Sequence, residues 1–130
     1  MIRASYLARL PDGLPLIAAM GNDQELYASF PDYKAHFKNI TRSVCDGTLK
    51  DPQCTLTANA YTFHFQIDLN VIYICLTDRS FPKKDAFAFL DTLRSKLYLT
   101  YSPEQIQSAH RPFSLLRFGI LFIIYLYDRG

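Results

Sequence analysis

The sequence of 130 residues has no tryptophan and only three cysteines. Cys45, Cys54 and Cys75 include no Cys-x-x-Cys pair, so the sequence predicts neither a disulfide framework nor a zinc site. We expect reduced thiols in a cytosolic setting. A bridge between Cys45 and Cys54 is the less favoured alternative, because small disulfide-stabilised domains usually carry more cysteines than this.

The net charge is small, glycines are few, and long apolar runs are missing. The net charge of +2 is too small to indicate nucleic acid or an anionic membrane as the main partner. The five glycines are scattered, so no phosphate-binding loop is predicted. No run reaches the roughly 20 apolar residues of a membrane span, and residues 118–127 come nearest. We therefore expect residues 1–130 to form a single domain without a cofactor or a direct membrane span.

The chain does contain one uninterrupted apolar strand, residues 71–77, followed by a helix over residues 82–99. The strand shows no alternation, which indicates that both of its faces are covered. In the helix Ala86, Leu90, Leu93 and Leu97 recur at helical spacing and predict a buried stripe. The two elements together indicate a sheet with helices on both sides.

The remaining pattern completes an α+β fold. Residues 2–10 and 14–20 read as a hairpin around Pro11-Asp12-Gly13, and Pro15 predicts that its second strand lies at a sheet edge. Apolar spacing predicts a helix to Val44, and alternation predicts two further strands. The sequence thus predicts a five-stranded, mostly antiparallel sheet, whose strand pairing stays open. The two further strands span residues 54–58 and 61–67, and the helix spans residues 33–44. Residues 21–26 and 100–110 are predicted to be polar connections.

The last segment, residues 115–127, is expected to be a further helix, although its β-branched and aromatic content also suits a strand. A helix that is apolar all round must be buried or touch a partner. We therefore expect this segment to support self-association or a partner contact. The residues that leave it without a polar face are Leu121, Phe122, Ile124 and Tyr125.

Candidates for chemistry are few. His36, His64 and His110 do not fall at a spacing typical of a metal site or a catalytic triad. Cys75 and His64 could form a nucleophile and base in a small cysteine-dependent hydrolase. We disfavour this alternative because a cysteine inside an apolar strand has a raised pKa and poor access. The sequence favours a non-enzymatic domain that presents surfaces.

Several short motifs run along nearly the whole chain. They are Ala8-Arg9, Asp12-Gly13-Leu14-Pro15-Leu16, Cys54-Thr55-Leu56, Thr62-Phe63-His64, Asp78-Arg79-Ser80-Phe81-Pro82-Lys83-Lys84, Ala86-Phe87-Ala88-Phe89-Leu90 and Arg111-Pro112-Phe113-Ser114. Together and in register, these motifs resemble the longin domains of vesicle-trafficking SNAREs of the Sec-twenty-two type, which act between the endoplasmic reticulum and the Golgi.

The resemblance implies a profilin-like fold, in which a five-stranded antiparallel sheet carries one helix on one face and two on the other. It also implies a regulatory module at the cytosolic face of endoplasmic reticulum and Golgi membranes. Such a module folds back on the SNARE motif of its own chain or binds cognate SNAREs, and vesicle coat subunits recognise it. The family's SNARE motif and membrane anchor are absent from this chain, which suggests a fragment or a longin-only variant. The alternative is a stand-alone longin-fold subunit of a coat adaptor or tethering complex.

For the partner site we expect an apolar groove between the helix over residues 33–44 and the strand over residues 54–58. A partner segment would lay alternate apolar side chains into it. No motif marks the groove, so its residues are chosen by region, and each could instead belong to the core. They are Tyr33, Phe37, Ile40, Val44 and Leu56.

Overall fold

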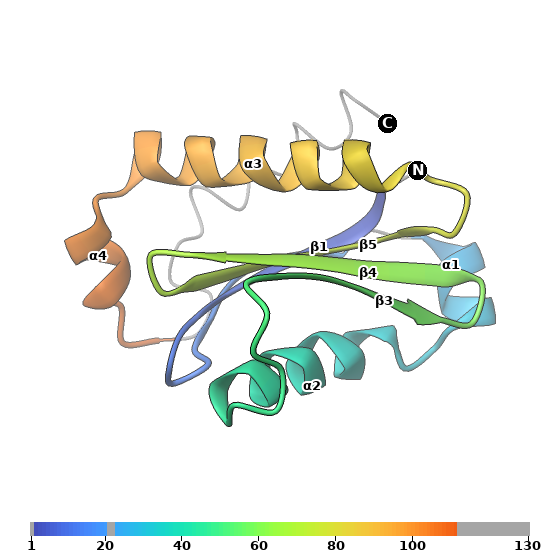
Figure 1. Ribbon diagram of the computed structural model, residues 1–130, viewed down its shortest axis with the longest axis horizontal. Coiled ribbons are helices and arrows are strands. Elements are labelled where there is room, and N and C mark those ends of the chain that lie inside the picture. Colours follow the sequence, from blue (N-terminus) through green and yellow to red (C-terminus); the bar gives the residue numbers. More distant parts are fainter. Residues whose placement is uncertain (1, 21–22, 112–130) are drawn as a thin grey trace.

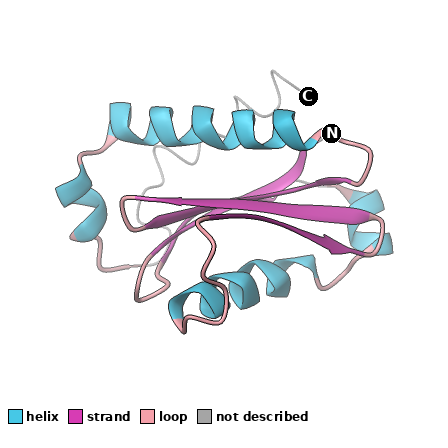
Figure 2. Ribbon diagram, in the orientation of Figure 1, coloured by secondary structure: helices cyan, strands magenta, loops and turns pink. Residues whose placement is uncertain are grey.

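The computed structural model describes residues 2–20 and 23–111, which form one sheet between two helical layers (Figure 1). Figure 2 shows helices above and below the sheet. In chain order the elements are β1 (Ile2–Arg9), β2 (Pro15–Met20), α1 (Gln24–Ser29), α2 (Tyr33–Cys45), β3 (Gln53–Ala58), β4 (Tyr61–Asp68), β5 (Val71–Asp78), α3 (Lys83–Thr100) and α4 (Pro103–Gln107).

The strand order is β2-β1-β5-β4-β3, with every neighbouring pair antiparallel. This confirms the predicted five-stranded antiparallel sheet and supplies the pairing that local pattern left open: the N-terminal hairpin joins the meander through β1 and β5. β5 is the middle strand, and its first seven residues are buried. β2, which carries Pro15, lies at an edge, where a missing N–H interrupts no ladder.

One face of the sheet packs against α1 and α2. Alternate residues of the strands point toward these helices, as the period of two requires. Phe37 of α2 stacks on Tyr6 of β1 at 5.4 Å between ring centroids and meets Phe63 of β4 edge-on at 5.3 Å. The core of this face is therefore largely aromatic. Its buried members include Ala4, Tyr6, Leu26, Phe30, Tyr33, Phe37, Ile40, Tyr61, Phe63, Phe65, Ile72, Ile74 and Leu76.

The opposite face packs against α3 and α4. The predicted stripe of α3 is buried, which confirms that prediction, and Phe89 and Ile106 join it. From β5 the residues Val71, Tyr73 and Cys75 point to this side, while Ile72, Ile74 and Leu76 point to the other. Both faces of the middle strand are thus covered, as the unbroken apolar run predicted.

Two short helices, α1 and α4, form where the sequence pattern predicts only polar connections. In α1, the side chain of Asp23 accepts a hydrogen bond from Leu26 N and caps the helix. In α4, Ser102 and Gln105 form a capping box in which each side chain bonds the other residue's backbone. Each helix buries one apolar residue, Leu26 or Ile106. The predicted last helix, with Leu121, Phe122, Ile124 and Tyr125, lies outside the described residues.

Arg3 ties the start of α1 to the sheet. Its guanidinium contacts Asp23 at 2.9 Å and Asp78 at 3.0 Å, with Glu25 further away at 3.6 Å. The side chain is 12% exposed and also lies 6.0 Å from the centroid of the Tyr61 ring. Because Asp23 is at once the helix cap and an ion-pair partner, this cluster holds α1 against the ends of β1 and β5.

Arg9 performs a similar task for α4. Its Nε and Nη2 atoms bind both carboxylate oxygens of Asp12, at 3.1 and 2.6 Å. Its Nη1 donates to three carbonyl oxygens at the end of α4, those of Ile106, Gln107 and Ala109, at 2.7 to 3.2 Å. The Ser108 and Ala109 amides also donate to the Ile106 carbonyl, so the guanidinium adds to this backbone capping, and it fastens the end of α4 to the β1–β2 turn.

A polar chain crosses the α3 face of the sheet. The Thr77 hydroxyl donates to the carbonyl of Asp78, so it can only accept from His64 Nε2, 3.2 Å away. The neutral ring then carries its proton on Nε2, and Nδ1 accepts from Thr55 Oγ1 at 3.1 Å. His64 is only 2% exposed. Burial lowers its pKa below the ordinary value of 6.5, and the charge of Lys83 lowers it further.

This histidine makes stability depend on pH. Since the folded pKa of His64 is below 6.5, the unfolded chain takes up a proton first as the pH falls. The stabilisation is complete above about pH 6.5 and is lost as the pH falls toward the folded pKa. Urea denaturation between pH 7.5 and 5 should show this loss, and His64→Leu should remove that part of it. The exposed His110, changed to Gln, is the matched control and should keep the wild-type slope. An unchanged slope in His64→Leu would contradict the assignment.

The Arg9 contacts predict a second effect. Arg9→Ala removes the side-chain hydrogen bonds that hold the end of α4 and should cost roughly 2 to 3 kcal/mol of unfolding free energy, because these hydrogen bonds are charge-assisted. Amide hydrogen exchange in α4 should accelerate. Arg94→Ala is the control: Arg94 is 40% exposed and contacts carboxylates only at 3.8 and 3.9 Å, so it should cost less than about 1 kcal/mol. Equal losses of unfolding free energy in the two variants would show that Arg9 does not hold the end of α4 in place.

Candidate protein-binding surfaces beside α2

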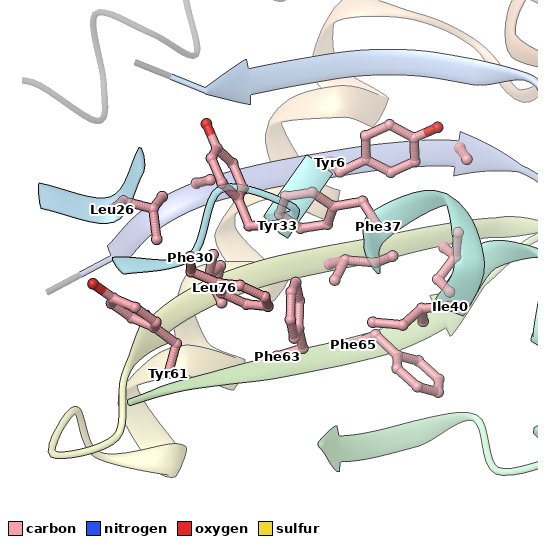
Figure 3. Close-up of a cluster of buried hydrophobic side chains, with 14 of the residues drawn as sticks. Tyr6, Leu26, Phe30, Tyr33, Phe37, Ile40, Tyr61, Phe63, Phe65 and Leu76 are labelled. Atoms are coloured by element: carbon pink, nitrogen blue, oxygen red, sulfur yellow. The ribbon is translucent and has the colours of Figure 1, made fainter. Parts of the chain in front are cut away.

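Three of the five predicted groove residues lie in the core. Tyr33, Phe37 and Ile40 are 0%, 0% and 7% exposed, and they project from α2 onto the sheet. Figure 3 shows Phe37 between Tyr6 and Phe63, with Ile40 further along the same helix. Side chains buried to this extent cannot contact a partner unless α2 moves. Their role in this structure is to hold α2 on the sheet.

The other two predicted residues, Val44 and Leu56, are partly exposed at the margin of the same core. Val44 lies in the last turn of α2, and Leu56 lies on β3. Further apolar residues of the margin come from β3 and from the loop that joins it to α2. We call this set the α2–β3 rim: Val44, Leu49, Cys54, Leu56 and Ala58.

The rim continues into the edge of the sheet. Among the described residues, β3 pairs only with β4, in a register from Gln53 opposite Gln66 to Ala58 opposite Tyr61. The other edge of β3 therefore offers backbone N–H and C=O groups that could pair with an extended segment. An unpaired strand edge beside partly exposed apolar side chains is a geometry that suits the addition of a peptide.

The opposite side of α2 has a different character. A hollow of about 380 Å³ lies between α2 and the β1–β2 turn, with Tyr6, Gly13 and Pro15 on the sheet side. From α2 it is lined by Lys38, Thr41, Arg42 and Cys45. The sequence analysis did not predict this hollow. The signal that could have found it is the spacing of Lys34, Lys38 and Arg42, four residues apart, which places all three along one side of a helix.

The Cys75 and His64 pair does not form a catalytic site in this structure. The two residues are direct neighbours across β5 and β4, and both are buried. Both ring nitrogens of His64 are engaged by Thr55 and Thr77, so neither is directed to the thiol. Burial raises the pKa of Cys75 well above its usual range, which keeps the thiol protonated.

Residues 2–20 and 23–111 contain no group of three histidine, cysteine, aspartate or glutamate side chains arranged to bind a metal ion. No helix within these ranges has the length and apolar character that a membrane crossing requires. Cys45, Cys54 and Cys75 are all free thiols.

Comparison with known proteins identifies the family. Residues 26–120 match the Longin family, described as a regulated-SNARE-like domain. The chain is 32% identical to the vesicle-trafficking protein SEC22b-B of Danio rerio and 34% identical to the vesicle-trafficking protein SEC22b of Xenopus tropicalis, each over 118 residues. It is 29% identical to the protein transport protein sec22 of Schizosaccharomyces pombe.

Each of these alignments covers 91% of this chain, and the chain spans about half the length of the curated relatives it matches, 53 to 54%. The names of the relatives describe trafficking and transport proteins rather than enzymes. The family match extends from α1 through α3 and α4, which include both helical layers of the sheet. The chain therefore belongs to the longin family of regulated-SNARE-like domains.

Proposed function

We propose that residues 1–130 act as one regulatory longin module of a vesicle-trafficking SNARE in transport between the endoplasmic reticulum and the Golgi. The similarity to vesicle-trafficking proteins over 91% of the chain carries this proposal. The module would work at the cytosolic face of these membranes through protein contacts. Its partners would be the SNARE motif of its own full-length chain or of cognate SNAREs, and subunits of the vesicle coat.

The α2–β3 rim is the surface that we assign to the SNARE segment. An extended segment paired with the free edge of β3 would place alternate side chains toward Leu56 and Val44, because side chains along a strand alternate between faces. The buried residues Tyr33, Phe37 and Ile40 would support this surface from beneath. The rim then provides apolar contact, and the β3 backbone provides hydrogen bonds that tolerate many sequences.

A charge placed on the rim should separate binding from folding. Val44→Glu with Leu56→Glu should weaken binding of a peptide carrying the SNARE motif of a Sec-twenty-two-type SNARE by about tenfold or more, because buried charge is costly at an apolar contact. Isothermal titration calorimetry measures the affinity. The thermal midpoint should fall by no more than about 5 °C, since both residues are only partly buried.

Leu99→Glu is the matched control, because Leu99 is 87% exposed on α3, on the other side of the sheet. It should leave the affinity unchanged. Equal binding by the wild type and the rim variant would refute the rim as the contact surface. If the wild type itself fails to bind any SNARE-motif peptide but binds purified coat subunits, the coat-adaptor or tether alternative gains support.

The apolar residues Leu121, Phe122, Ile124 and Tyr125 remain our candidates for self-association or a partner contact. Sedimentation equilibrium of the 130-residue chain should give a mass that rises with protein concentration, because an apolar surface of this kind associates in water. Leu121→Glu with Ile124→Glu should restore the monomer mass. A wild-type mass that is independent of concentration would exclude self-association.

A further inference from the structure

The outward side of α2 is basic along its whole length. Lys34, Lys38 and Arg42 follow each other at intervals of four residues, and all three are exposed. The helix from Tyr33 to Cys45 contains no acidic residue. Residues four apart on a helix are neighbours, so the three cations form one line about two turns long. The net charge of +2 for the whole chain conceals this local concentration.

Two of these cations border the hollow of about 380 Å³ beside the β1–β2 turn. Lys38 and Arg42 stand on one wall, and Gly13 forms part of the other, with a φ of +73° that brings the backbone close to α2. A Cβ at Gly13 would lie 3.7 Å from the Thr41 and Cys45 side chains. Asp12 also lines the hollow, but its carboxylate is held by Arg9 at 2.6 and 3.1 Å, which balances its charge.

The line of cations continues to an exposed aromatic residue. Tyr27 of α1 is 40% exposed, and the Lys34 ammonium lies 5.1 Å from the centroid of its ring. Tyrosine combines an apolar ring with a polar tip and is enriched where protein meets the membrane interface. Basic residues beside such an aromatic are typical of surfaces that lie against anionic lipid.

We propose that this face binds the phosphorylated head group of an anionic membrane lipid. Lys38 and Arg42 would hold the phosphate at the mouth of the hollow, and Lys34 and Tyr27 would rest on the surrounding bilayer surface. A phosphate monoester carries up to two negative charges and suits a pair of cations one turn apart, and the arginine fork can bind two of its oxygens. An acidic peptide side chain offers only one charge. The inference goes beyond the proposed protein contacts and does not require them.

The volume of the hollow agrees with this assignment. About 380 Å³ lies within the range of small-molecule sites, so a single sugar-phosphate head group can enter it. The site lies across α2 from the α2–β3 rim, since the hollow contacts Lys38, Thr41 and Arg42 while the rim is built on Val44 and β3. A bound lipid and a bound SNARE segment would therefore occupy different sides of the same helix.

Vesicle co-sedimentation of the 130-residue chain tests the proposal. The probes are phosphatidylcholine vesicles, alone, with phosphatidylserine, or with a few mole per cent of a phosphatidylinositol monophosphate. Binding should be strongest to the phosphoinositide vesicles. Because each cation near an anionic surface contributes about fivefold in affinity, Lys38→Glu with Arg42→Glu should weaken binding by roughly 30-fold or more. The circular dichroism spectrum and thermal midpoint of this double variant should match those of the wild type, since the Lys38 and Arg42 side chains are exposed.

Arg79→Glu with Lys84→Glu is the matched control. It makes the same change in charge at two exposed positions near the start of α3, on the other helical layer, and should bind vesicles like the wild type. Equal loss in both variants, or equal binding to the phosphatidylserine and phosphoinositide vesicles, would overturn the proposal in favour of general charge attraction. Competition by soluble inositol phosphate supports a head-group site. If the chain binds inorganic phosphate or a polyglutamate peptide but does not bind vesicles, the proposal that the ligand is a membrane lipid is refuted.

Discussion

The fold depends on one strand that is apolar on both sides. β5 lies in the middle of the sheet, and its first seven residues are buried. A strand of this kind is stable only if helices remove both of its faces from water. α2 covers one face through Tyr33, Phe37 and Ile40, and α3 covers the other through Leu90, Leu93 and Leu97. The outer sides of these helices and the edges of the sheet are what remains for binding.

This constraint separates the residues that build α2 into two groups. The side that faces β5 is aromatic and closed, with Phe37 in contact with rings from β1 and β4. The flanks of the helix are open and differ from each other: an apolar margin beside β3 and a basic hollow beside the β1–β2 turn. One helix thus presents two chemically different surfaces while its inner side maintains the fold.

Periodicity predicted the elements that repeat a pattern over many residues. β3 and β4 follow from alternation, and α2 and α3 follow from helical spacing. The β1–β2 hairpin follows instead from its Pro-Asp-Gly turn, and β5 with its two-sided burial follows from an unbroken apolar run. The short helices α1 and α4 escaped prediction because five or six residues are too few to show a period, although Ser102 and Gln105 have the spacing of a capping box. A helix of that length depends mainly on its caps and tertiary contacts.

The candidate site was harder to predict because periodicity does not distinguish a groove from a core. Tyr33, Phe37 and Ile40 share the spacing of Val44, and only the position of α2 over the sheet decides which are buried. The contacts of Arg3 and Arg9 also could not be predicted from local sequence pattern. Arg3 meets Asp78 across 75 residues, and Arg9 meets the end of α4 across about 100. Such pairs depend on topology, and a single sequence contains no local sign of them.

The position of Arg9 has a mechanical consequence. The backbone carbonyls of Ile106, Gln107 and Ala109 are held by a side chain of β1, shortly before the chain continues past Arg111. A tensile load applied to residues further along would reach these three hydrogen bonds before it reached α3. These hydrogen bonds transmit the load to β1, which is an interior strand paired with β2 on one edge and β5 on the other. The force is therefore shared by the backbone hydrogen bonds of both pairs, and α3 is protected from unravelling.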